Sequence, residues 1–428
     1  MKILIRGAHV VDPSQNLNAK KNILINDSVI EAIVDPQEKV YSVDQSIDLD
    51  ENSFIAPGLV DMHVHFRDPG QVHKEDLKSG SLAAVAGGYT SVMCMPNTYP
   101  PNDNVEITRY IVEKAKKEAL CHVYPVGAIS KSLMGEQMAP LQDLKTAGCV
   151  AFSDDGRPCK ETQVFKNAMQ VAAQLKVPII EHCEDLEVSK GKTTISNGDV
   201  AEKLGLEGLD SDVETLDVLR SITLAGETGC HLHLAHLSCK ESIEILRKVK
   251  PKMANISAEV CPHHLFLTTQ SILKYQSNAK MYPPLRHDAD NKILQAALAE
   301  GLIDVIATDH APHTEDEKSH EFCSAPNGIL GLQTALASSL QMVNEGKISL
   351  INLIARMSTQ PAKLAHLDAG SLSPGSKADL CVFVQKKGER LSQSHNFSKS
   401  SNSPLWDIDL YGKVLMTFVE GKMVYGEY

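Results

Sequence analysis

The chain contains eight short apolar runs separated by amphipathic segments, and this alternation restricts the fold more than any other feature. The runs are IAPGLVDMHVH, YTSVMCMP, CHVYPVGAI, CVAFSDD, VPIIEHCED, CHLHLAHLS, NISAEVCPHH and LIDVIATDH. Each is apolar enough for a strand buried on both faces. Between two of them, Val164, Ala168, Val171 and Leu175 recur at helical spacing. Eight such strands alternating with helices predict an α/β fold, a (β/α)8 TIM barrel over residues 55–365.

The two ends of the chain have a different pattern. The runs MKILIRGAHVVD and KNILINDSVIEAIV at the front, and ADLCVFV and KVLMTFVEGKMVYG at the back, are short, strand-like and joined by turn residues. We therefore expect residues 1–54 and 366–428 to form one small β-sandwich built from both termini. The polar, serine-rich stretch KKGERLSQSHNFSKSSNSP is predicted to be a loop within that sandwich.

The composition argues against several classes of protein. A net charge of −12, with no basic block and a single tryptophan, does not favour nucleic acid as a partner. The N-terminal residues lack the long apolar core of a signal peptide, and glycines and prolines interrupt the longest uncharged stretch, residues 79–102. Ten cysteines without a CxxC pair predict neither disulfides nor a cysteine zinc site, and most are expected to be small buried side chains. We expect a cytoplasmic protein with no membrane partner.

Metal-binding residue types follow the ends of several predicted strands. His63 and His65 are two residues apart, so on a strand both side chains point to the same side and can bind one ion. In a barrel of this type, the C-terminal strand ends form the active site. Five runs end in candidate ligands: His63, His65, Asp155, His182, His236 and Asp309. Neutral imidazoles with carboxylates suit Zn²⁺ or a similar ion, and six ligands are enough for one or two ions that share a carboxylate.

The other histidines near these motifs have less specific predictions. His231 and His233 lie at the start of their strand, away from the predicted site, and are expected to be structural. His310 alternates away from the barrel axis and is expected to support the site from outside or to be structural. For His263 and His264, a role beside the metal ligands and a role in packing both remain open.

The motifs HVHFRDPG, MPNT, SDDG, EHCED, HLAHLS and ATDHAPH, in this order on a barrel with a composite sandwich, resemble the amidohydrolase superfamily. Within it the chain is most similar to the class I dihydroorotases. This resemblance spans nearly the whole chain. It implies a small-molecule substrate, through the reversible cyclisation of N-carbamoyl-L-aspartate to L-dihydroorotate in pyrimidine biosynthesis. The metal motifs are shared with hydantoinases and allantoinases, so they indicate the superfamily more firmly than the substrate.

The resemblance also implies a role for each site residue. It assigns His63, His65 and Asp309 to one metal ion, His182 and His236 to a second, and Asp155 to both. Asp309 would act as the general acid and base for a metal-activated hydroxide. Arg67, Asn97 and His313 would hold the substrate carboxylate, for which the planar guanidinium of Arg67 is well suited. A salt bridge from Arg67 to Asp68 or Glu75 is the structural alternative.

Two positions depart from patterns found in related enzymes. Many relatives have a carboxylated lysine between the two ions, but no lysine lies between Lys145 and Lys160, so Asp155 must serve, as in class I dihydroorotases. In KMYPPLR, Tyr282 stands where the family usually has Asn. Tyr282 would then either contact the substrate in place of Asn or pack against Pro283 and Pro284, and packing is slightly favoured.

Two other functions remain open at this point. One is the hydrolysis of another cyclic amide, as in a hydantoinase or allantoinase. The other is a non-catalytic homologue that scaffolds a partner such as aspartate transcarbamoylase, although a scaffold does not need six placed ligands. The resemblance further implies a homodimer and a possible association with aspartate transcarbamoylase. Residues 314–327, a polar segment after the eighth predicted strand, are long enough to form a lid over the site.

Overall fold

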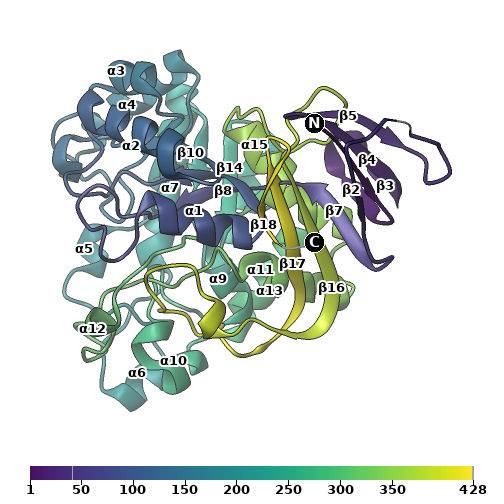
Figure 1. Ribbon diagram of the computed structural model, residues 1–428. Helices are drawn as coiled ribbons and strands as arrows, with labels where there is room; N and C mark the ends of the chain where they lie inside the picture. Colours follow the sequence, from purple (N-terminus) through teal and green to yellow (C-terminus); the bar gives the residue numbers. More distant parts are fainter. Residues whose placement is uncertain (41, 427–428) are drawn as a thin grey trace.

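The computed structural model describes residues 1–40 and 42–426, and within them eight parallel strands form a barrel surrounded by helices (Figure 1). The strands pair in sequence order: β8 (Leu59–Val64), β9 (Tyr89–Cys94), β10 (His122–Gly127), β11 (Ala151–Phe152), β12 (Ile179–Glu181), β13 (Leu232–Leu234), β14 (Ile256–Val260) and β15 (Val305–Ile306). A parallel bridge between Val64 and His310 joins the first strand to the residues that follow the last. The predicted barrel is confirmed.

Helices follow the strands in the alternating order that the sequence predicts. The longer ones are α1 (Leu77–Ala86), α2 (Val105–Glu118), α3 (Leu141–Ala147), α4 (Thr162–Leu175), α7 (Asp212–Thr228), α8 (Lys240–Val249), α11 (Asp288–Glu300) and α13 (Ala335–Asn344). Shorter ones lie in the connections: α5 (Leu186–Ser189), α6 (Asp199–Leu204), α9 (Pro262–Phe266), α10 (Gln270–Tyr275), α12 (Glu315–Lys318), α14 (Leu350–Ile354) and α15 (Gln360–Leu364). None of the helices in the described ranges is long and apolar enough to cross a membrane.

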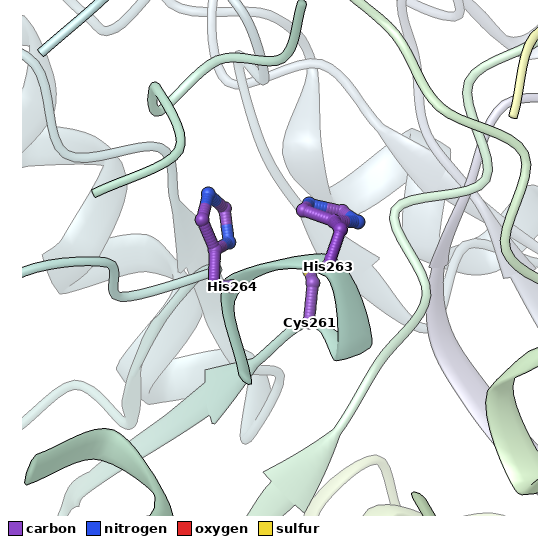
Figure 2. A group of neighbouring side chains, drawn as sticks. All are labelled: Cys261, His263 and His264. Carbon is purple, nitrogen blue, oxygen red and sulfur yellow. The ribbon is translucent and has the colours of Figure 1, made fainter. Parts of the chain in front are cut away.

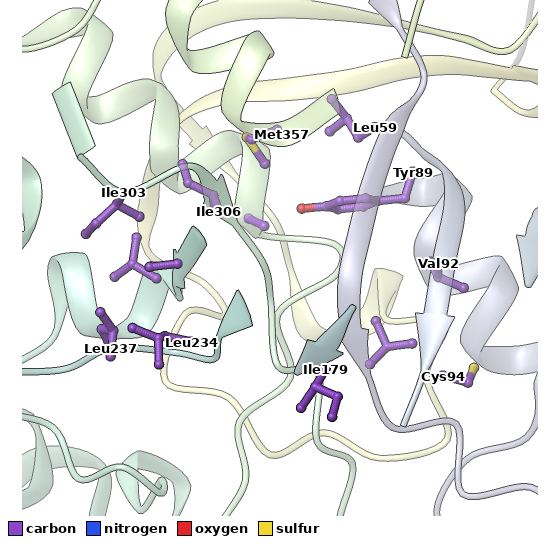
Figure 3. Close-up of a cluster of buried hydrophobic side chains, with 14 of the residues drawn as sticks. Leu59, Tyr89, Val92, Cys94, Ile179, Leu234, Leu237, Ile303, Ile306 and Met357 are labelled. Carbon is purple, nitrogen blue, oxygen red and sulfur yellow. The ribbon is translucent and has the colours of Figure 1, made fainter. Parts of the chain in front are cut away.

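Two layers of apolar side chains pack the barrel. The larger cluster includes Leu234, Ile306 and Val92, which point outward from the strands toward the helices (Figure 3). A smaller cluster includes Ile180 and Ala307, each two residues before a predicted metal ligand. Because strand side chains alternate, this smaller cluster lies on the inner side and forms the floor beneath the ligands.

Both termini contribute to the sheets beside the barrel. One sheet has the order β5-β4-β1-β6, with β1 (Lys2–Arg6), β4 (Asn22–Asn26), β5 (Val29–Val34) and β6 (Gln45–Asp48). The other has the order β18-β17-β16-β7-β2-β3, with β2 (His9–Asp12), β3 (Leu17–Lys20), β7 (Ser53–Pro57), β16 (Leu380–Arg390), β17 (Asp409–Val419) and β18 (Lys422–Tyr425). Strand β7 pairs with β2 and β16, so the second sheet joins the two ends of the chain. The exact domain boundaries stay a prediction.

The serine-rich stretch near the C-terminus differs from its prediction as a loop within the sandwich. Its first residues continue β16 to Arg390, and the following segment runs along the barrel. There Lys399 pairs with Asp76, Ser400 donates to the Lys74 carbonyl, and Asn402 donates to the Ala311 carbonyl at 3.0 Å. The polar composition correctly predicted a loop for the part after Arg390. It could not show that the side chains of this loop bond to groups on the barrel.

Candidate metal centre and substrate cavity

The six predicted ligands come together at the C-terminal end of the barrel. His63 and His65 lie at the end of β8, and Asp155, His182, His236 and Asp309 follow β11, β12, β13 and β15. All six are buried, with exposed fractions of 5% or less. Their ligand atoms form overlapping groups of three, each compact enough to hold an ion: His63–His65–Asp155, Asp155–His182–His236 and His63–His236–Asp309.

The carboxylate of Asp155 lies at the centre of this cluster. Four imidazole nitrogens surround its oxygens: His63 Nε2 at 3.3 Å, His65 Nε2 at 3.5 Å, His182 Nδ1 at 3.7 Å and His236 Nε2 at 3.7 Å. Asp309 Oδ1 lies 2.9 Å from His65 Nε2. Because Asp155 belongs to two of the ligand groups, its position fits a carboxylate shared between two ions.

Hydrogen bonds on the far side of the imidazoles fix which nitrogen faces the cluster. His63 Nδ1–H donates to Glu259 Oε1 at 2.9 Å, and His65 Nδ1–H donates to Asn97 Oδ1 at 2.8 Å. The other nitrogen of each ring, Nε2, then faces the carboxylates of Asp155 and Asp309. His63 Nε2 is buried without a hydrogen-bond partner. Imidazole nitrogens and buried carboxylates that face one another in this way fit a divalent metal ion held between them.

The electrostatics of the cluster lead to the same conclusion. Burial alone would raise the pKa values of Asp155 and Asp309, but His63 and its neighbours lower both, that of Asp309 to about 2. Burial lowers the pKa of His63, and Asp155 and Asp309 more than offset this and raise it well above its usual value. The carboxylates are therefore ionised and attract positive charge.

Glu259 supports the site, and the sequence analysis missed it. It lies on β14 with its side chain fully buried, and it accepts hydrogen bonds from His63 and, at 3.0 Å, from His233 Nε2. Burial would raise the pKa of Glu259, but these two histidines hold it well below its usual value. A charged residue in the middle of the apolar run NISAEVCPHH was the available signal, because a buried carboxylate needs partners. His233 is thus part of the support of His63.

Glu184 is a second supporting carboxylate that the sequence analysis did not identify. Its Oε2 lies 3.4 Å from His182 Nε2, on the side of the ring away from Asp155, and it accepts a hydrogen bond from Ser189 Oγ at 2.6 Å. Burial would raise its pKa, but His182 lowers it. Glu184 therefore orients His182 in the way that carboxylates commonly orient metal-binding histidines.

A cavity of about 640 Å³ opens above the cluster, and all four predicted substrate contacts line it: Arg67, Asn97, Tyr282 and His313. Arg67 Nε donates to the Pro312 carbonyl at 3.3 Å, and Nη2 lies 3.3 Å from His313 Nε2. Asp68 pairs with Lys114 and Glu75 with His310, so Arg67 has no salt bridge within the described part of the chain. Its guanidinium is therefore available to an anion beside the metal ligands.

His313 lies between Arg67 and a carboxylate. Its Nδ1 lies 3.3 Å from Glu317 Oε2, and Glu317 pairs with Lys74. Burial and Arg67 lower the pKa of His313 to about 3, so the ring is neutral. The His313 backbone N–H donates to Asn402 Oδ1 at 3.0 Å, which makes the C-terminal segment part of the support of the cavity.

Asn97 and Tyr282 contact the metal ligands as well as the cavity. Asn97 accepts from His65 and lies 3.3 Å from Asp155 Oδ2 through its Nδ2. The Tyr282 ring stacks on His182, with centroids 5.2 Å apart and an interplanar angle of 25°. Its hydroxyl is buried and has no hydrogen-bond partner among the described residues. Burial and the charge of Glu184 raise the pKa of the phenol, which keeps it protonated.

The segment predicted as a lid lies beside the cavity, and Pro326 and Asn327 line it. Lys280 Nζ donates to the carbonyls of Cys323 and Ala325 at 3.0 and 2.7 Å. Lys318 Nζ donates to those of Pro326 and Gly328, both at 2.9 Å. Two lysine side chains thus hold the segment in place. Its movement as a lid stays a prediction.

Three residues of the site have a left-handed backbone that side chains with a Cβ rarely adopt. These are Arg67 (φ 58°), His236 (φ 30°) and Asp309 (φ 46°). Such conformations cost about 1–3 kcal/mol each and persist where the surrounding structure enforces them. Their occurrence at two candidate metal ligands and at Arg67 indicates that side-chain placement at this site outweighs local backbone preference.

The remaining histidines lie outside the ligand groups of the cluster. His310 Nε2 lies 3.3 Å from Glu75, and its Nδ1 accepts from the backbone of Gly331 at 3.3 Å. His231 Nε2 lies 2.9 Å from Ser257 Oγ.

Comparison with known proteins adds independent evidence. Residues 52–242 match a family described as "Dihydro-orotase-like". The chain is 43% identical to the dihydroorotase of Aquifex aeolicus (strain VF5), over 99% of both proteins, and 41% identical to that of Syntrophus aciditrophicus (strain SB), over 100% of both. Its fold is similar to the L-hydantoinase (dihydropyrimidinase) of Arthrobacter aurescens, with a TM-score of 0.88 and 24% identity, covering 99% of this chain and 96% of that one.

The barrel, the composite sandwich and the ligand cluster together define a metal-dependent cyclic amidohydrolase. The likeness to the hydantoinase concerns the fold alone at this level of identity. The full-length relatives narrow the class: the chain belongs to the dihydroorotase family.

His236 lies beside Asp155 at the C-terminal end of the barrel, outside the apolar core. We therefore expect His236→Ala to lower the amount of bound metal and to abolish turnover without unfolding the barrel. His231→Ala, at the other end of the same strand, is the control. Metal content by mass spectrometry, turnover and circular dichroism would be compared. Normal metal content and full turnover in His236→Ala would refute its assignment as a ligand.

Proposed function

We propose that the protein interconverts N-carbamoyl-L-aspartate and L-dihydroorotate, the dihydroorotase reaction of pyrimidine biosynthesis. The observation that carries this proposal is the central position of Asp155 among four imidazoles, in a strand end without lysine. An aspartate there is what the resemblance to class I dihydroorotases implies, whereas many other relatives use a carboxylated lysine. The full-length identity to dihydroorotases supports the same substrate.

We further propose that the cluster holds one or two Zn²⁺ ions. His63, His65 and Asp309 would bind one, His182 and His236 the other, and Asp155 both. Imidazole and carboxylate ligands suit Zn²⁺. Bound there, such ions lower the pKa of water and polarise a carbonyl group.

The residues of the chain supply positioning and proton transfer. Asp309 is ionised and belongs to the cluster, so it is placed to accept the proton of the attacking water and return it to the leaving ring nitrogen. Arg67 and His313, 3.3 Å apart, form a polar wall that can hold the carboxylate retained in both substrate and product. Asn97 accepts a hydrogen bond from His65 and lines the same cavity, where it can contact the same group. In the cyclising direction, the same residues act in reverse order.

Two alternatives have weaker support. Hydrolysis of a hydantoin or of allantoin is favoured by the shared barrel, but the structural likeness at 24% identity concerns the fold alone. A non-catalytic scaffold for aspartate transcarbamoylase would not require a complete ligand cluster with supporting carboxylates. We retain the cytoplasmic location expected from the sequence, and the homodimer and possible association with aspartate transcarbamoylase implied by the resemblance.

The direct test is the ultraviolet absorbance of dihydroorotate during incubation with the purified protein, in both directions. We expect dihydroorotate to be consumed and, from carbamoyl aspartate, to be formed. Hydantoin and allantoin are the comparison substrates, and His236→Ala is the matched inactive protein. Faster turnover of hydantoin or allantoin than of dihydroorotate would contradict the proposal.

Arg67→Lys is expected to raise KM for carbamoyl aspartate by about tenfold or more, because a planar fork that can make two charge-assisted hydrogen bonds is replaced by a single point charge. Metal content should stay at the wild-type level, since Arg67 contacts no member of the ligand cluster. The exposed Arg109 on α2 allows the matched control Arg109→Lys. An unchanged KM would show that the carboxylate is held elsewhere.

Tyr282→Phe tests the position where the family usually has Asn. Tyr282 lines the cavity and its buried hydroxyl has no hydrogen-bond partner among the described residues, so we now favour donation to the substrate over the packing role that the sequence slightly favoured. Removal of the hydroxyl should then raise KM by about fivefold, equivalent to about 1 kcal/mol. The ring, and with it the stacking on His182, is retained in the variant. If steady-state kinetics show no change in KM, Tyr282 serves only to pack against its neighbours.

A further inference from the structure

Cys261, His263 and His264 form a second cluster of ligand types, separate from the six residues above. They lie close together where β14 ends and α9 begins (Figure 2). All three are buried, with exposed fractions of 2% or less. One ligand atom from each lies within 4.8 Å of the other two. None of the three lines the substrate cavity.

The hydrogen bond of His264 fixes its tautomer. His264 Nε2 lies 2.9 Å from the Pro283 carbonyl oxygen, and a carbonyl can only accept, so Nε2 carries the proton. Nδ1 of the neutral ring then has a lone pair. This nitrogen is buried without a partner and faces His263 (Figure 2). An N–H donated to a backbone carbonyl, with a free lone pair on the other nitrogen, is the usual arrangement of a metal-binding histidine.

The imidazole of His263 is even less satisfied. Its ring makes no hydrogen bond to any described residue, and Nε2 is completely buried. The His263 and His264 ring centroids are 4.4 Å apart, so the two unsatisfied imidazoles are direct neighbours. Buried polar groups without partners are rare in native proteins, and each one calls for an occupant or a bound water.

We propose that Cys261, His263 and His264 form an additional metal site for a thiophilic divalent ion such as Zn²⁺, outside the catalytic cluster. One sulfur and two imidazoles leave a fourth position for water, a set that suits Zn²⁺. Tetrahedral ligands at zinc distances lie about 3.3–3.7 Å apart, so the side chains need to approach by no more than about 1.5 Å. On binding, the Cys261 thiol loses its proton to solvent and the sulfur forms the bond to the ion.

The ligand set also predicts selectivity and a structural effect. A sulfur ligand with two imidazoles favours ions with high affinity for thiolate, and Mg²⁺ and Ca²⁺, which prefer oxygen ligands, are disfavoured. An ion on His264 Nδ1 makes Nε2–H a stronger donor to Pro283. The site would thereby hold the residue next to Tyr282, which lines the substrate cavity.

Co²⁺ spectroscopy can separate this site from the catalytic one, because the six catalytic ligands include no sulfur. The full-length protein would be produced in zinc-poor medium with Co²⁺, in a Cys323→Ser background that removes the one exposed cysteine among the described residues. We expect a near-ultraviolet thiolate-to-cobalt charge-transfer band in this protein and its loss in Cys261→Ser. The control Cys159→Ser changes another buried cysteine and should keep the band.

His263→Gln provides a second test that leaves the sulfur in place. We expect at least a tenfold weaker retention of the sulfur-bound Co²⁺ on dialysis against a weak chelator. No charge-transfer band in the parent protein, or a band that survives Cys261→Ser, would overturn the proposal. If Cys261→Ser does not fold, an unchanged band and retention in His263→Gln would overturn it. None of these outcomes tests the proposed dihydroorotase activity, because the catalytic cluster has its own ligands.

Discussion

The position of the Asp155 carboxylate among four imidazole nitrogens is the interaction on which the rest of the site depends. Two carboxylates and four histidines are buried together at the mouth of the barrel, and groups of this kind are costly to bury unless a cation compensates them. The barrel makes the arrangement possible, because five strand ends point their last residues at one axis. Apolar side chains such as Ile180 and Ala307 fill the interior below and exclude water from beneath the ligands.

The cluster is held by contacts on the far side of its imidazoles. Glu259 accepts a hydrogen bond from His63 and Asn97 accepts one from His65, while the Glu184 carboxylate lies 3.4 Å from His182; each contact is on the side of the ring away from Asp155. The support extends to the C-terminal segment, where Asn402 binds the backbone of His313. The segment after β16 therefore connects the sandwich to the substrate cavity, and the sandwich contributes to the site as well as to the fold.

The sequence was sufficient for the barrel and for the proximity of the six ligands because both follow from local periodicity. Alternation along a strand places His63 with His65, and strand ends in one barrel converge. The supporting residues were not predicted, because the contact of Glu259 with His63 or of Asn402 with His313 joins residues far apart in sequence without a local pattern. The serine-rich segment shows the same limit. The prediction that most cysteines are buried is confirmed. The sequence did not show that two imidazoles with unsatisfied nitrogens lie beside Cys261, because this depends on the hydrogen bonds that the folded chain leaves unmade.

The central claim is that the chain provides the shared carboxylate itself, through Asp155. It is tested most directly by removing the metal with a chelator and restoring it with Zn²⁺ alone in buffer free of carbon dioxide, with dihydroorotase activity as the readout. A carboxylated lysine would need carbon dioxide to form again, whereas an aspartate does not. The account predicts full recovery with Zn²⁺ alone and no further gain from bicarbonate. Recovery that depends on bicarbonate would contradict it, because a lysine from another segment would then be supplying the shared ligand.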